Sequence, residues 1–245
     1  MQIITVAIQK GGTGKTTTAA AIVQAAAYKG RRVLAIDIDP QGNLSFALAA
    51  DTSKPGSYNL LMGEDAAGLI QHKPGYDIIP ASWNLSTITS GKGSARRLQR
   101  AITPLKRDYD LIVIDTPPTA GELQYNALQA ATGLVIPLQA DIYNLQSLYQ
   151  ITDTARQIQQ TNPALQITGF ILTQYDNRST IARQMKDTIT EQAAAMGVPY
   201  LGAIRAAVAV KEAAALQQSL FEYAPKSKPA ADYLTVYETI TKQEE

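Results

Sequence analysis

Short uninterrupted runs of apolar residues recur along the chain, separated by longer segments in which apolar residues follow a helical period. The runs do not alternate polar with apolar positions, so each predicted strand has both faces covered by other elements. Strands that alternate with helices of this length are typical of a parallel sheet with crossover helices. The predicted strands are residues 3–8, 33–37, 76–79, 111–115, 134–138, 168–173 and 200–204.

The segments between and after these strands predict helices that cover both faces of a mostly parallel, twisted sheet in an α/β fold. Gly30 follows the first helix as a C-terminal cap, and residues 51–56 form the clearest loop. Residues 225–229 link the last two helices, so we expect one domain over residues 1–245, with the helices at about 208–241 packed on it. The predicted helices are residues 15–29, 95–105, 122–131, 145–160, 180–196, 208–223 and 230–241.

Composition fits one sizeable globular domain, since 45% of the 245 residues are hydrophobic and 18% are charged. The chain has no cysteine, which excludes disulfides, zinc–thiolate sites and iron–sulfur clusters. The N-terminal run has no basic leader or cleavage site, and no stretch approaches the roughly 20 apolar residues of a membrane span. We therefore expect a cytoplasmic protein. A net charge of +1 neither predicts nor excludes nucleic-acid binding, because cations can gather on one face.

A glycine-rich loop joins the first predicted strand to the first long helix. Glycines let backbone N–H groups turn inward around phosphate oxygens, and the following helix offers its positive end to the same phosphates. Gln9 stands where the common phosphate-loop pattern has glycine, and a lysine and a glycine pair follow it. Lys15 is placed to reach the β- and γ-phosphates, and the Thr16 hydroxyl to ligate Mg²⁺. The expected phosphate-binding residues are Lys10, Gly11, Gly12, Thr13, Gly14, Lys15, Thr16 and Thr17.

Three aspartates follow predicted strands at their carboxyl ends, the edge at which α/β sheets bind ligands. Asp37 and Asp39 close the second strand at a spacing of two, which puts both on the same side while the segment stays extended. Asp-Pro and Gly-Asn pairs make the same segment a turn, which explains its backbone but not its two acids. Asp115 ends an apolar run, the arrangement in which an acid holds Mg²⁺ beside a phosphate loop.

In these residues the chain resembles the ParA/MinD family of P-loop ATPases, whose mark is K-G-G-x-G-K-[ST]. The resemblance extends from residue 4 to about residue 240 and implies a P-loop NTPase fold with Mg²⁺-dependent hydrolysis of ATP. It further implies a homodimer that encloses two ATP molecules, in which Lys10 reaches the phosphates bound by the partner subunit. Such a lysine acts as a cation supplied in trans. Lys10, Lys15 and Asp39 are then catalytic, with Asp39 positioning or activating the attacking water.

The resemblance also assigns residues to the metal and to the base. Asp37 would support the shell around Mg²⁺, and the strand that ends near residue 173 would lead into the residues that frame adenine. Arg205 stands where the family has proline, and Ala206 where it has arginine, which leaves the geometry of this segment open. The implied metal ligands are Thr16, Asp39 and Asp115, and the further nucleotide contacts are Asp37, Thr173, Gln174 and Arg205.

Branches of this family differ in their partners. MinD-type members end in a basic amphipathic helix that lies on the membrane, whereas residues 237–245 are acidic here, so we expect no membrane partner. Branches that need cysteines are excluded, which leaves ParA-type partition. Resemblance to the ParA branch implies ATP-dependent, sequence-independent DNA binding, association with the nucleoid, and a ParB-like DNA-bound adaptor. Candidate DNA contacts are Arg178, Arg183, Lys186, Arg205, Lys211, Lys226 and Lys228.

Three hypotheses therefore stand. The first is a ParA-like ATPase that segregates a plasmid, a mobile element or a chromosome region with an adaptor that stimulates hydrolysis. The second is a ParA-like ATPase that positions a protein cargo and uses the nucleoid as its matrix. The third is a metabolic P-loop enzyme, such as a ligase similar to dethiobiotin synthetase. Nothing in the sequence separates the first two, and the third lacks the signature of a dedicated small-molecule pocket.

Overall fold

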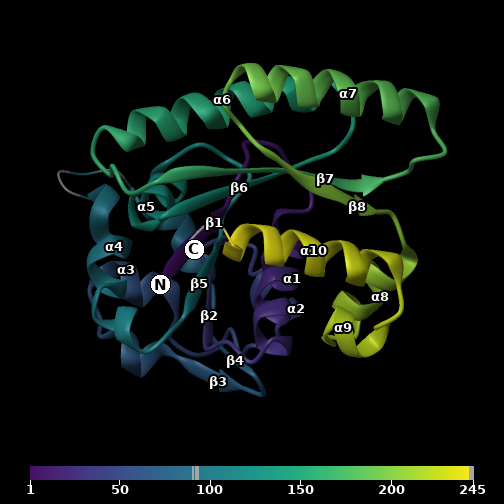
Figure 1. Cartoon of the computed structure of the whole chain (residues 1–245). Coiled ribbons are helices and arrows are strands. Elements are labelled where there is room, and N and C mark those ends of the chain that lie inside the picture. Colours follow the sequence, from purple (N-terminus) through teal and green to yellow (C-terminus); the bar gives the residue numbers. More distant parts are fainter. Residues whose placement is uncertain (90, 92–93, 243–245) are drawn as a thin grey trace.

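A twisted sheet forms the centre of the molecule (Figure 1). The computed structural model describes residues 1–89, 91 and 94–242, and over these residues the sheet has eight strands in the order β3-β4-β2-β5-β1-β6-β7-β8. Neighbouring strands are parallel, apart from the antiparallel pair β3 and β4 at one edge. The strands are β1 (Gln2–Val6), β2 (Val33–Asp37), β3 (Gln71–Lys73), β4 (Tyr76–Ile79), β5 (Leu111–Asp115), β6 (Gly133–Leu138), β7 (Gln166–Tyr175) and β8 (Tyr200–Arg205).

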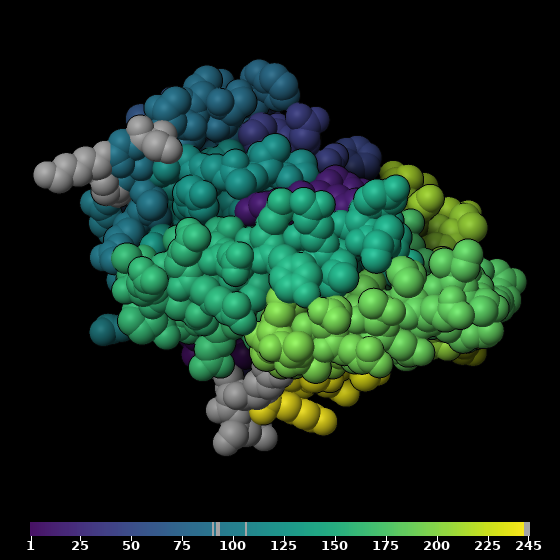
Figure 2. Space-filling model, turned by 90° about the horizontal axis from the view of Figure 1, so that it is seen from above, coloured from purple at the N-terminus to yellow at the C-terminus, as the bar shows by residue number. Residues whose placement is uncertain are grey.

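Helices cover both faces of the sheet, as the sequence predicts. They are α1 (Lys15–Tyr28), α2 (Asn43–Ala47), α3 (Ser57–Met62), α4 (Arg97–Ile102), α5 (Glu122–Ala130), α6 (Ile142–Gln159), α7 (Thr180–Ala195), α8 (Val208–Ala215), α9 (Leu220–Tyr223) and α10 (Lys228–Lys242). One face packs against α1, α2, α9 and α10, and the other against α3 to α7. Figure 2 looks down on α6 and α7, which lie side by side across the second face.

The two core layers explain why the strand residues are apolar without alternation. Successive side chains of a strand point to opposite faces. In β1, Ile3 therefore joins the core beneath α3, α4 and α5, while Ile4 joins the core beneath α1 and α10. In β2, Leu34 and Ala35 divide in the same way. Each position is buried on its own side, which confirms the parallel, doubly covered sheet.

The last helix packs against the first elements of the chain. Its apolar residues Tyr233, Val236 and Ile240 share the core with the alanines of α1. The Gln2 side chain in β1 donates a hydrogen bond through Nε2 to the Ile240 carbonyl at 3.1 Å. The apolar face of α10 is thus buried, and residues 243–245 lie outside the described range. No helix in the described part of the chain has the length and the apolar character needed to cross a bilayer.

Two predicted helices are wrong in extent. The helix expected over residues 95–105 is a 3₁₀ turn, Ser94–Arg96, then α4, then a second 3₁₀ turn, Pro104–Arg107. Pro104 has no N–H to donate to a carbonyl of the preceding turn, which ends the hydrogen bonding of α4. The helix expected over residues 208–223 is interrupted between α8 and α9. There Gln217 is left-handed, with φ of 54°, and the Ser219 hydroxyl accepts from the N–H of Phe221 to begin α9.

The remaining differences lie at element ends and in short elements. The short helices α2 and α3 were not predicted, and neither was the edge strand β3, whose three residues are all polar. Helix α6 begins earlier than predicted because the Asp141 side chain accepts from the N–H of Asn144 and caps it. Helix α10 begins at Lys228, so part of the predicted linker is helical.

Candidate nucleotide site

The glycine-rich loop lies between the carboxyl end of β1 and the first turn of α1. Gly12 and Gly14 have left-handed backbone, with φ of 75° and 86°. A Cβ on Gly14 would also lie 3.3 Å from Cγ2 of Thr173, so strain and crowding both require glycine there. Gly14 immediately precedes α1, whose first-turn N–H groups have no partners within the helix and can bind an anion.

Side chains from other strands hold the carbonyls of this loop. The Gly12 carbonyl accepts from Nε2 of Gln139 at 3.0 Å and from Nε2 of Gln174 at 3.3 Å. The Thr13 carbonyl accepts from Oγ1 of Thr173 at 2.7 Å. Outward carbonyls leave N–H groups free to face inward, which is the arrangement that a phosphate needs. The loop is therefore braced by residues that follow β6 and end β7, and Gln139 was not among the predicted residues.

The two lysines of the loop point in different directions. Nζ of Lys15 donates to the Lys10 carbonyl at 2.7 Å, and the side chain is almost fully buried. Burial lowers the pKa of Lys15, an effect that the charges of Asp115 and Asp39 oppose. Lys10 turns toward α6, where its Nζ lies 3.2 Å from Oδ1 of Asp141. Sequence reasoning missed Asp141, although an aspartate just before a helix is a recognisable cap.

Thr16 and Asp115 lie within hydrogen-bond distance of each other. Oγ1 of Thr16 donates to Oδ2 of Asp115 at 2.7 Å. The other carboxylate oxygen, Oδ1, is buried and has no hydrogen-bond partner among the described residues. Burial, with the charge of Asp37 next in effect, raises the pKa of Asp115 well above its usual value. A hydroxyl beside a carboxylate with an unused oxygen fits a hydrated Mg²⁺, whose preferred ligands are oxygens.

The two acids of the second strand have different surroundings. Asp37 is fully buried, and its Oδ2 accepts from the N–H and from the hydroxyl of Ser45, each at 2.7 Å. Its Oδ1 accepts from the N–H of Asp39 at 3.1 Å, and burial raises its pKa to about 6. Asp39 lines the pocket that the loop opens into, whereas Asp37 does not. Asp37 therefore braces the segment that carries Asp39, a role for which Ser45 is the partner that sequence reasoning missed.

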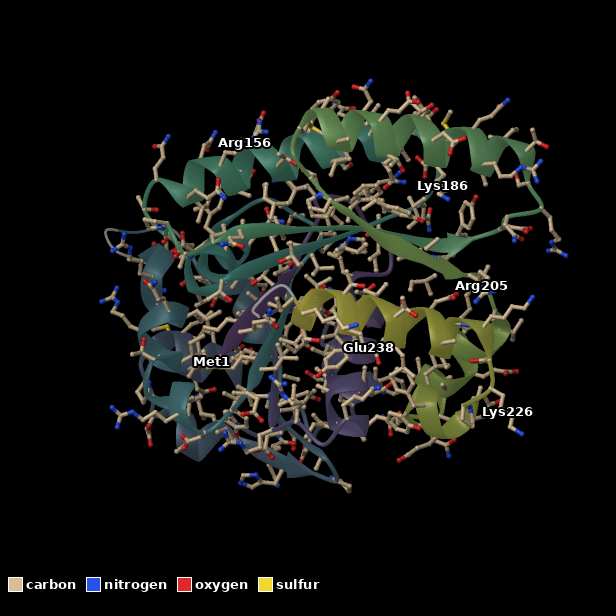
Figure 3. All side chains as sticks on the ribbon, viewed as in Figure 1. Met1, Arg156, Lys186, Arg205, Lys226 and Glu238 are labelled. Atoms are coloured by element: carbon tan, nitrogen blue, oxygen red, sulfur yellow. The ribbon has the colours of Figure 1, made fainter. Side chains whose placement is uncertain are left out.

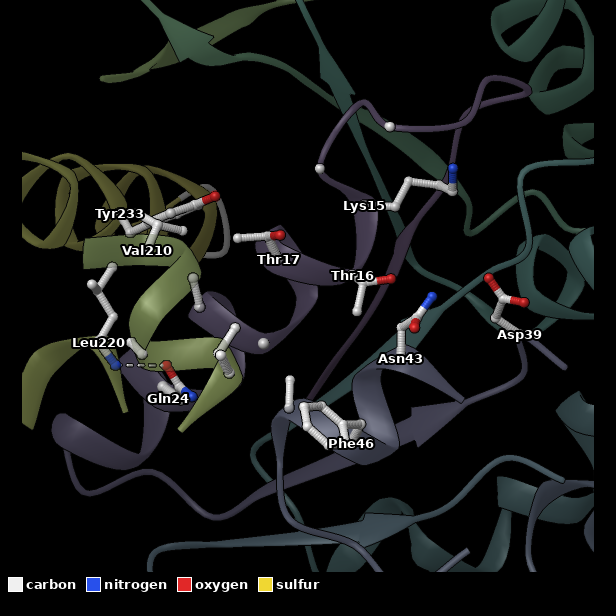
Figure 4. Close-up of a pocket in the computed structure, with 18 of the residues that line it drawn as sticks. Lys15, Thr16, Thr17, Gln24, Asp39, Asn43, Phe46, Val210, Leu220 and Tyr233 are labelled. Atoms are coloured by element: carbon white, nitrogen blue, oxygen red, sulfur yellow. Dashed lines mark hydrogen bonds between the residues drawn. The ribbon is translucent and has the colours of Figure 1, made fainter. Parts of the chain in front are cut away.

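Two adjoining pockets surround the loop. The larger, about 510 Å³, runs from the loop and Asp39 along α1, with α2 on one side and the residues of α8 and α9 on the other (Figure 4). The smaller, about 340 Å³, lies between the loop and the segment after β8. The predicted residues that line the larger pocket are Gly11, Gly12, Gly14, Lys15, Thr16, Thr17, Asp39 and Gln174. Those that line the smaller one are Gly14, Thr17, Thr173, Gln174 and Arg205.

Arg205 is already engaged by an acid. Its backbone N–H and its Nε both donate to Oδ2 of Asp232, at 3.0 and 2.9 Å, and its guanidinium also reaches the second oxygen. This two-point pair ties β8 to α10. Arg205 thus borders the smaller pocket with its charge satisfied, which makes it an unsuitable candidate for a DNA contact.

The other candidate DNA contacts fall into two groups. Arg178 pairs with Asp176 at 3.0 Å, Arg183 donates to the Asn177 carbonyl, and Lys186 lies over the ring of Tyr200. Lys211, Lys226 and Lys228 have no carboxylate within ion-pair distance among the described residues. In Figure 3, Arg205 and Lys226 lie on the same side of the molecule, and Lys186 lies between α7 and the sheet.

A parallel sheet, a glycine loop between its first strand and a buried helix, and acids at the adjoining strand ends define a P-loop nucleotide-binding protein. A family model described as an AAA domain matches residues 1–167. The chain is 34% identical over 240 residues to the chromosome-partitioning ATPase Soj of Thermus thermophilus, covering 97% of this chain and 94% of that protein. It is 38% identical over 198 residues to the chromosome partitioning protein ParA of Caulobacter vibrioides, covering 76% and 74%.

A solved structure gives the same result for the fold. Cobyrinic acid a,c-diamide synthase from Mycobacterium smegmatis, with bound ATP analog and magnesium, superposes with a TM-score of 0.86 at 30% identity, covering 100% of this chain and 96% of that one. The chain belongs to the ParA/Soj family of P-loop ATPases. The family resemblance and the fold class expected from the sequence are confirmed.

Proposed function

We propose that the protein is an Mg²⁺-dependent ATPase that dimerises around ATP, binds DNA without sequence preference in that state, and segregates DNA with a ParB-like, DNA-bound adaptor that stimulates hydrolysis. The observation that carries this proposal is the placing of Thr16 against Asp115 beside the braced glycine loop, with Asp39 on the same pocket. Its relatives Soj and ParA are partitioning proteins.

The phosphates bind at the loop and at the start of α1. The first-turn N–H groups donate to phosphate oxygens, and the Lys15 ammonium exchanges the Lys10 carbonyl for the β- and γ-phosphates. When bound, Mg²⁺ neutralises charge on the same phosphates, and Thr16 and Asp115 are the residues that would hold it, directly or through water. The smaller pocket, lined by Thr173 and Gln174, receives the base.

Hydrolysis needs a water and a further cation. Asp39 accepts from the N–H of Gln41 at 3.0 Å, which orients its carboxylate within the pocket so that it can position the attacking water. Lys10 leaves Asp141 and neutralises the charge that develops on the phosphoryl group of the partner subunit. Release of Lys10 from Asp141 is therefore coupled to the formation of the dimer.

The second candidate is a metabolic enzyme. The observation that favours it is the fold match to a synthase at 30% identity over the whole chain. The larger pocket also extends well beyond the phosphate end, which gives such an enzyme room for a small molecule. Positioning of a protein cargo remains a variant of the first candidate, because it uses the same nucleotide site and the same DNA surface.

One experiment separates the two candidates. The chain is incubated with ATP or with ADP, and its mass in solution and its retention of non-specific DNA are measured at low salt. We expect a dimer that retains DNA with ATP, and a monomer that does not with ADP. If the ATP form fails to retain DNA even at low salt, the partition proposal is wrong and the synthase candidate gains.

A further inference from the structure

The larger pocket continues past the phosphate end into a chamber of small side chains. We define the chamber by Ala20, Ala21 and Gln24 of α1, Ala213 and Ala214 of α8, and Leu220 of α9. Gln24 lies seven residues after Thr17, about 10 Å farther along the helix at about 1.5 Å per residue. Phosphates bound at the first turn of α1 therefore leave the chamber open to another group.

Phe46 and Tyr233 are the aromatic side chains that line the pocket, and Tyr233 is buried whereas Phe46 is exposed. The Phe46 side chain is 54% exposed, although it adjoins several alanines. Asn43, Phe46 and Ala47 are spaced by three and four residues, so they share one face of α2, and all three line the pocket. Figure 4 shows Asn43 toward Thr16, with Phe46 across the chamber from Leu220 and Gln24. The same face of α2 thus lines both the phosphate end of the pocket and the chamber.

Helix α2 is anchored in its middle, where Ser45 binds Asp37 and Leu44 is buried in the core, and it is bounded by two bends. Ser45 fixes it to Asp37 through its N–H and its hydroxyl. Gly42 before the helix and Ala49 after it both have left-handed backbone, with φ of 65° and 53°. Left-handed backbone is strained for alanine, so this end of the helix holds energy that a change of conformation can release. Because the anchor is central, a small rotation about Ser45 moves Asn43 and Phe46 together.

We propose that Phe46 is a positioning residue of the nucleotide site: when ATP is bound, α2 turns about Ser45, Asn43 approaches the phosphates, and the Phe46 ring enters the chamber. The inference rests on the proposed ATPase function. Burial of the ring favours the arrangement in which Asp39 and Asn43 close on the triphosphate. The chamber also offers the ring a donor, since Nε2 of Gln24 has no acceptor among the described residues and an aromatic face can receive an N–H.

The first test compares affinities for ATP and ADP by calorimetry. Phe46→Ala should weaken ATP binding about tenfold, the order expected for loss of a half-buried aromatic side chain, and leave ADP binding nearly unchanged. Phe46→Leu should recover most of the loss. Met62→Ala, at a position 58% exposed on α3, is the matched control and should change neither affinity. Equal losses for ATP and ADP, or no loss, would overturn the proposal.

The second test fills the chamber. Ala214→Leu should weaken ATP binding as Phe46→Ala does, and the double variant should be no worse than either, because both remove the same contact. If Ala214→Leu weakens ATP binding while Phe46→Ala does not, the chamber holds part of the nucleotide and the proposal is wrong. If the unaltered protein binds no ATP, the proposed function itself fails, which is a different result from unchanged variants of a protein that binds ATP.

The third test follows the position of the side chain. Because the chain has no cysteine, Phe46→Cys and Met62→Cys each place a single thiol on the protein. Labelling of the thiol at position 46 should slow several-fold with ATP and not with ADP. Labelling at position 62 should be the same with either nucleotide. A thiol at position 46 that reacts equally with ATP and ADP would contradict the movement of α2.

Discussion

Burial sets the chemistry of single side chains in the nucleotide site. Lys15 is an ammonium almost without solvent, and burial makes its charged form less favourable, while Asp115 and Asp39 act in the opposite direction. A cation held this way is ready to pair with a phosphate, because little hydration must be removed when the anion arrives. Its present acceptor, the Lys10 carbonyl, is a weaker partner than a phosphate oxygen.

Lys15→Ala should abolish nucleotide binding, with a loss of at least about 100-fold in affinity, because backbone N–H groups alone cannot replace the buried cation. Calorimetric titration with Mg²⁺ and ATP measures this loss. Lys29→Ala, just after the C-terminal end of the same helix, is the control, since Lys29 is exposed and pairs with Glu238 on the surface. Unchanged ATP affinity in Lys15→Ala would show that the loop does not bind phosphate.

Asp39→Ala should bind ATP and still form the dimer, but hydrolysis should slow by about 10²–10⁴, the usual loss for a positioned base. Release of phosphate under saturating ATP measures the rate. Asp51→Ala, which removes an exposed acid from the following loop, should hydrolyse ATP like the unaltered protein. A normal rate in Asp39→Ala would assign the water to another residue.

The motif residues of the site could be predicted because their chemistry is local. The glycine-rich loop identifies Lys15 and Thr16, and the apolar strand that ends at Asp115 identifies this acid. The partner of Lys10 could not be predicted, because its contact with Asp141 spans 131 positions and depends on how β6 lies beside β1. The pairing of Arg205 with Asp232 of α10 could not be predicted either, because no sequence pattern links the two residues.

At the scale of elements, the end of β2 and the start of α2 act as one unit through Asp37. This carboxylate is fully buried and accepts three hydrogen bonds, from Ser45 twice and from Asp39 once. The end of β2 can be predicted from the apolar run of the strand, whereas α2 is too short to show a helical period. The break between α8 and α9 escaped prediction for a related reason, since an alanine-rich segment favours helix throughout and Gln217 carries no turn signature.

The pKa of Asp37 predicts how the stability of this unit depends on pH. Its value of about 6 in the folded protein lies above the ordinary 3.8, so the folded state binds the proton more tightly. The resulting contribution to the free energy of unfolding, about 3 kcal/mol, is complete below about pH 4 and is lost as the pH rises through 6. Denaturant unfolding between pH 4 and 7, without nucleotide, measures it.

Asp37→Asn should flatten that pH dependence, because the titrating proton is gone. It should also lower the free energy of unfolding at every pH, since an amide offers a donor where Ser45 already donates. The comparison cancels the titration of acids far from Asp37, whereas Asp115, whose pKa the charge of Asp37 raises, changes with it. Parallel curves for the two proteins would mean that Asp37 does not titrate in this range.

At the scale of the whole molecule, the proposed function makes Lys10 the cation that each subunit supplies to its partner. Lys10→Ala should leave ATP binding by the monomer within a few-fold, and should impair the ATP-dependent dimer and its hydrolysis, because the cation in trans is missing. Mass in solution with and without ATP measures dimerisation, and phosphate release measures hydrolysis. Lys54→Ala, an exposed lysine paired with Asp51, is the control. A normal dimer with normal turnover would leave Lys10 only its contact with Asp141.

DNA binding should require ATP and weaken steeply with salt, because each neutralised phosphate releases counterions. Lys226→Glu and Lys228→Glu should lower DNA retention and reduce its dependence on salt, while ATP-dependent dimerisation persists. Arg32→Glu makes the same change in net charge at a residue paired with Asp110, and should affect DNA binding less. Equal effects of all three would indicate a response to net charge rather than a DNA surface. Charge reversal of Arg205 would instead break its pair with Asp232.

The contact between Gln2 and Ile240 has a consequence for biosynthesis. The first strand leaves the ribosome early, but the layer that covers one face of the sheet is completed only by α10, whose Tyr233, Val236 and Ile240 pack against α1. Until those residues emerge, the alanine surface of α1 stays uncovered. Contacts between residues so far apart form slowly, since the intervening chain must first be ordered. Translation of the final helix is thus the step at which a nascent chain exchanges a chaperone-accessible surface for a closed core.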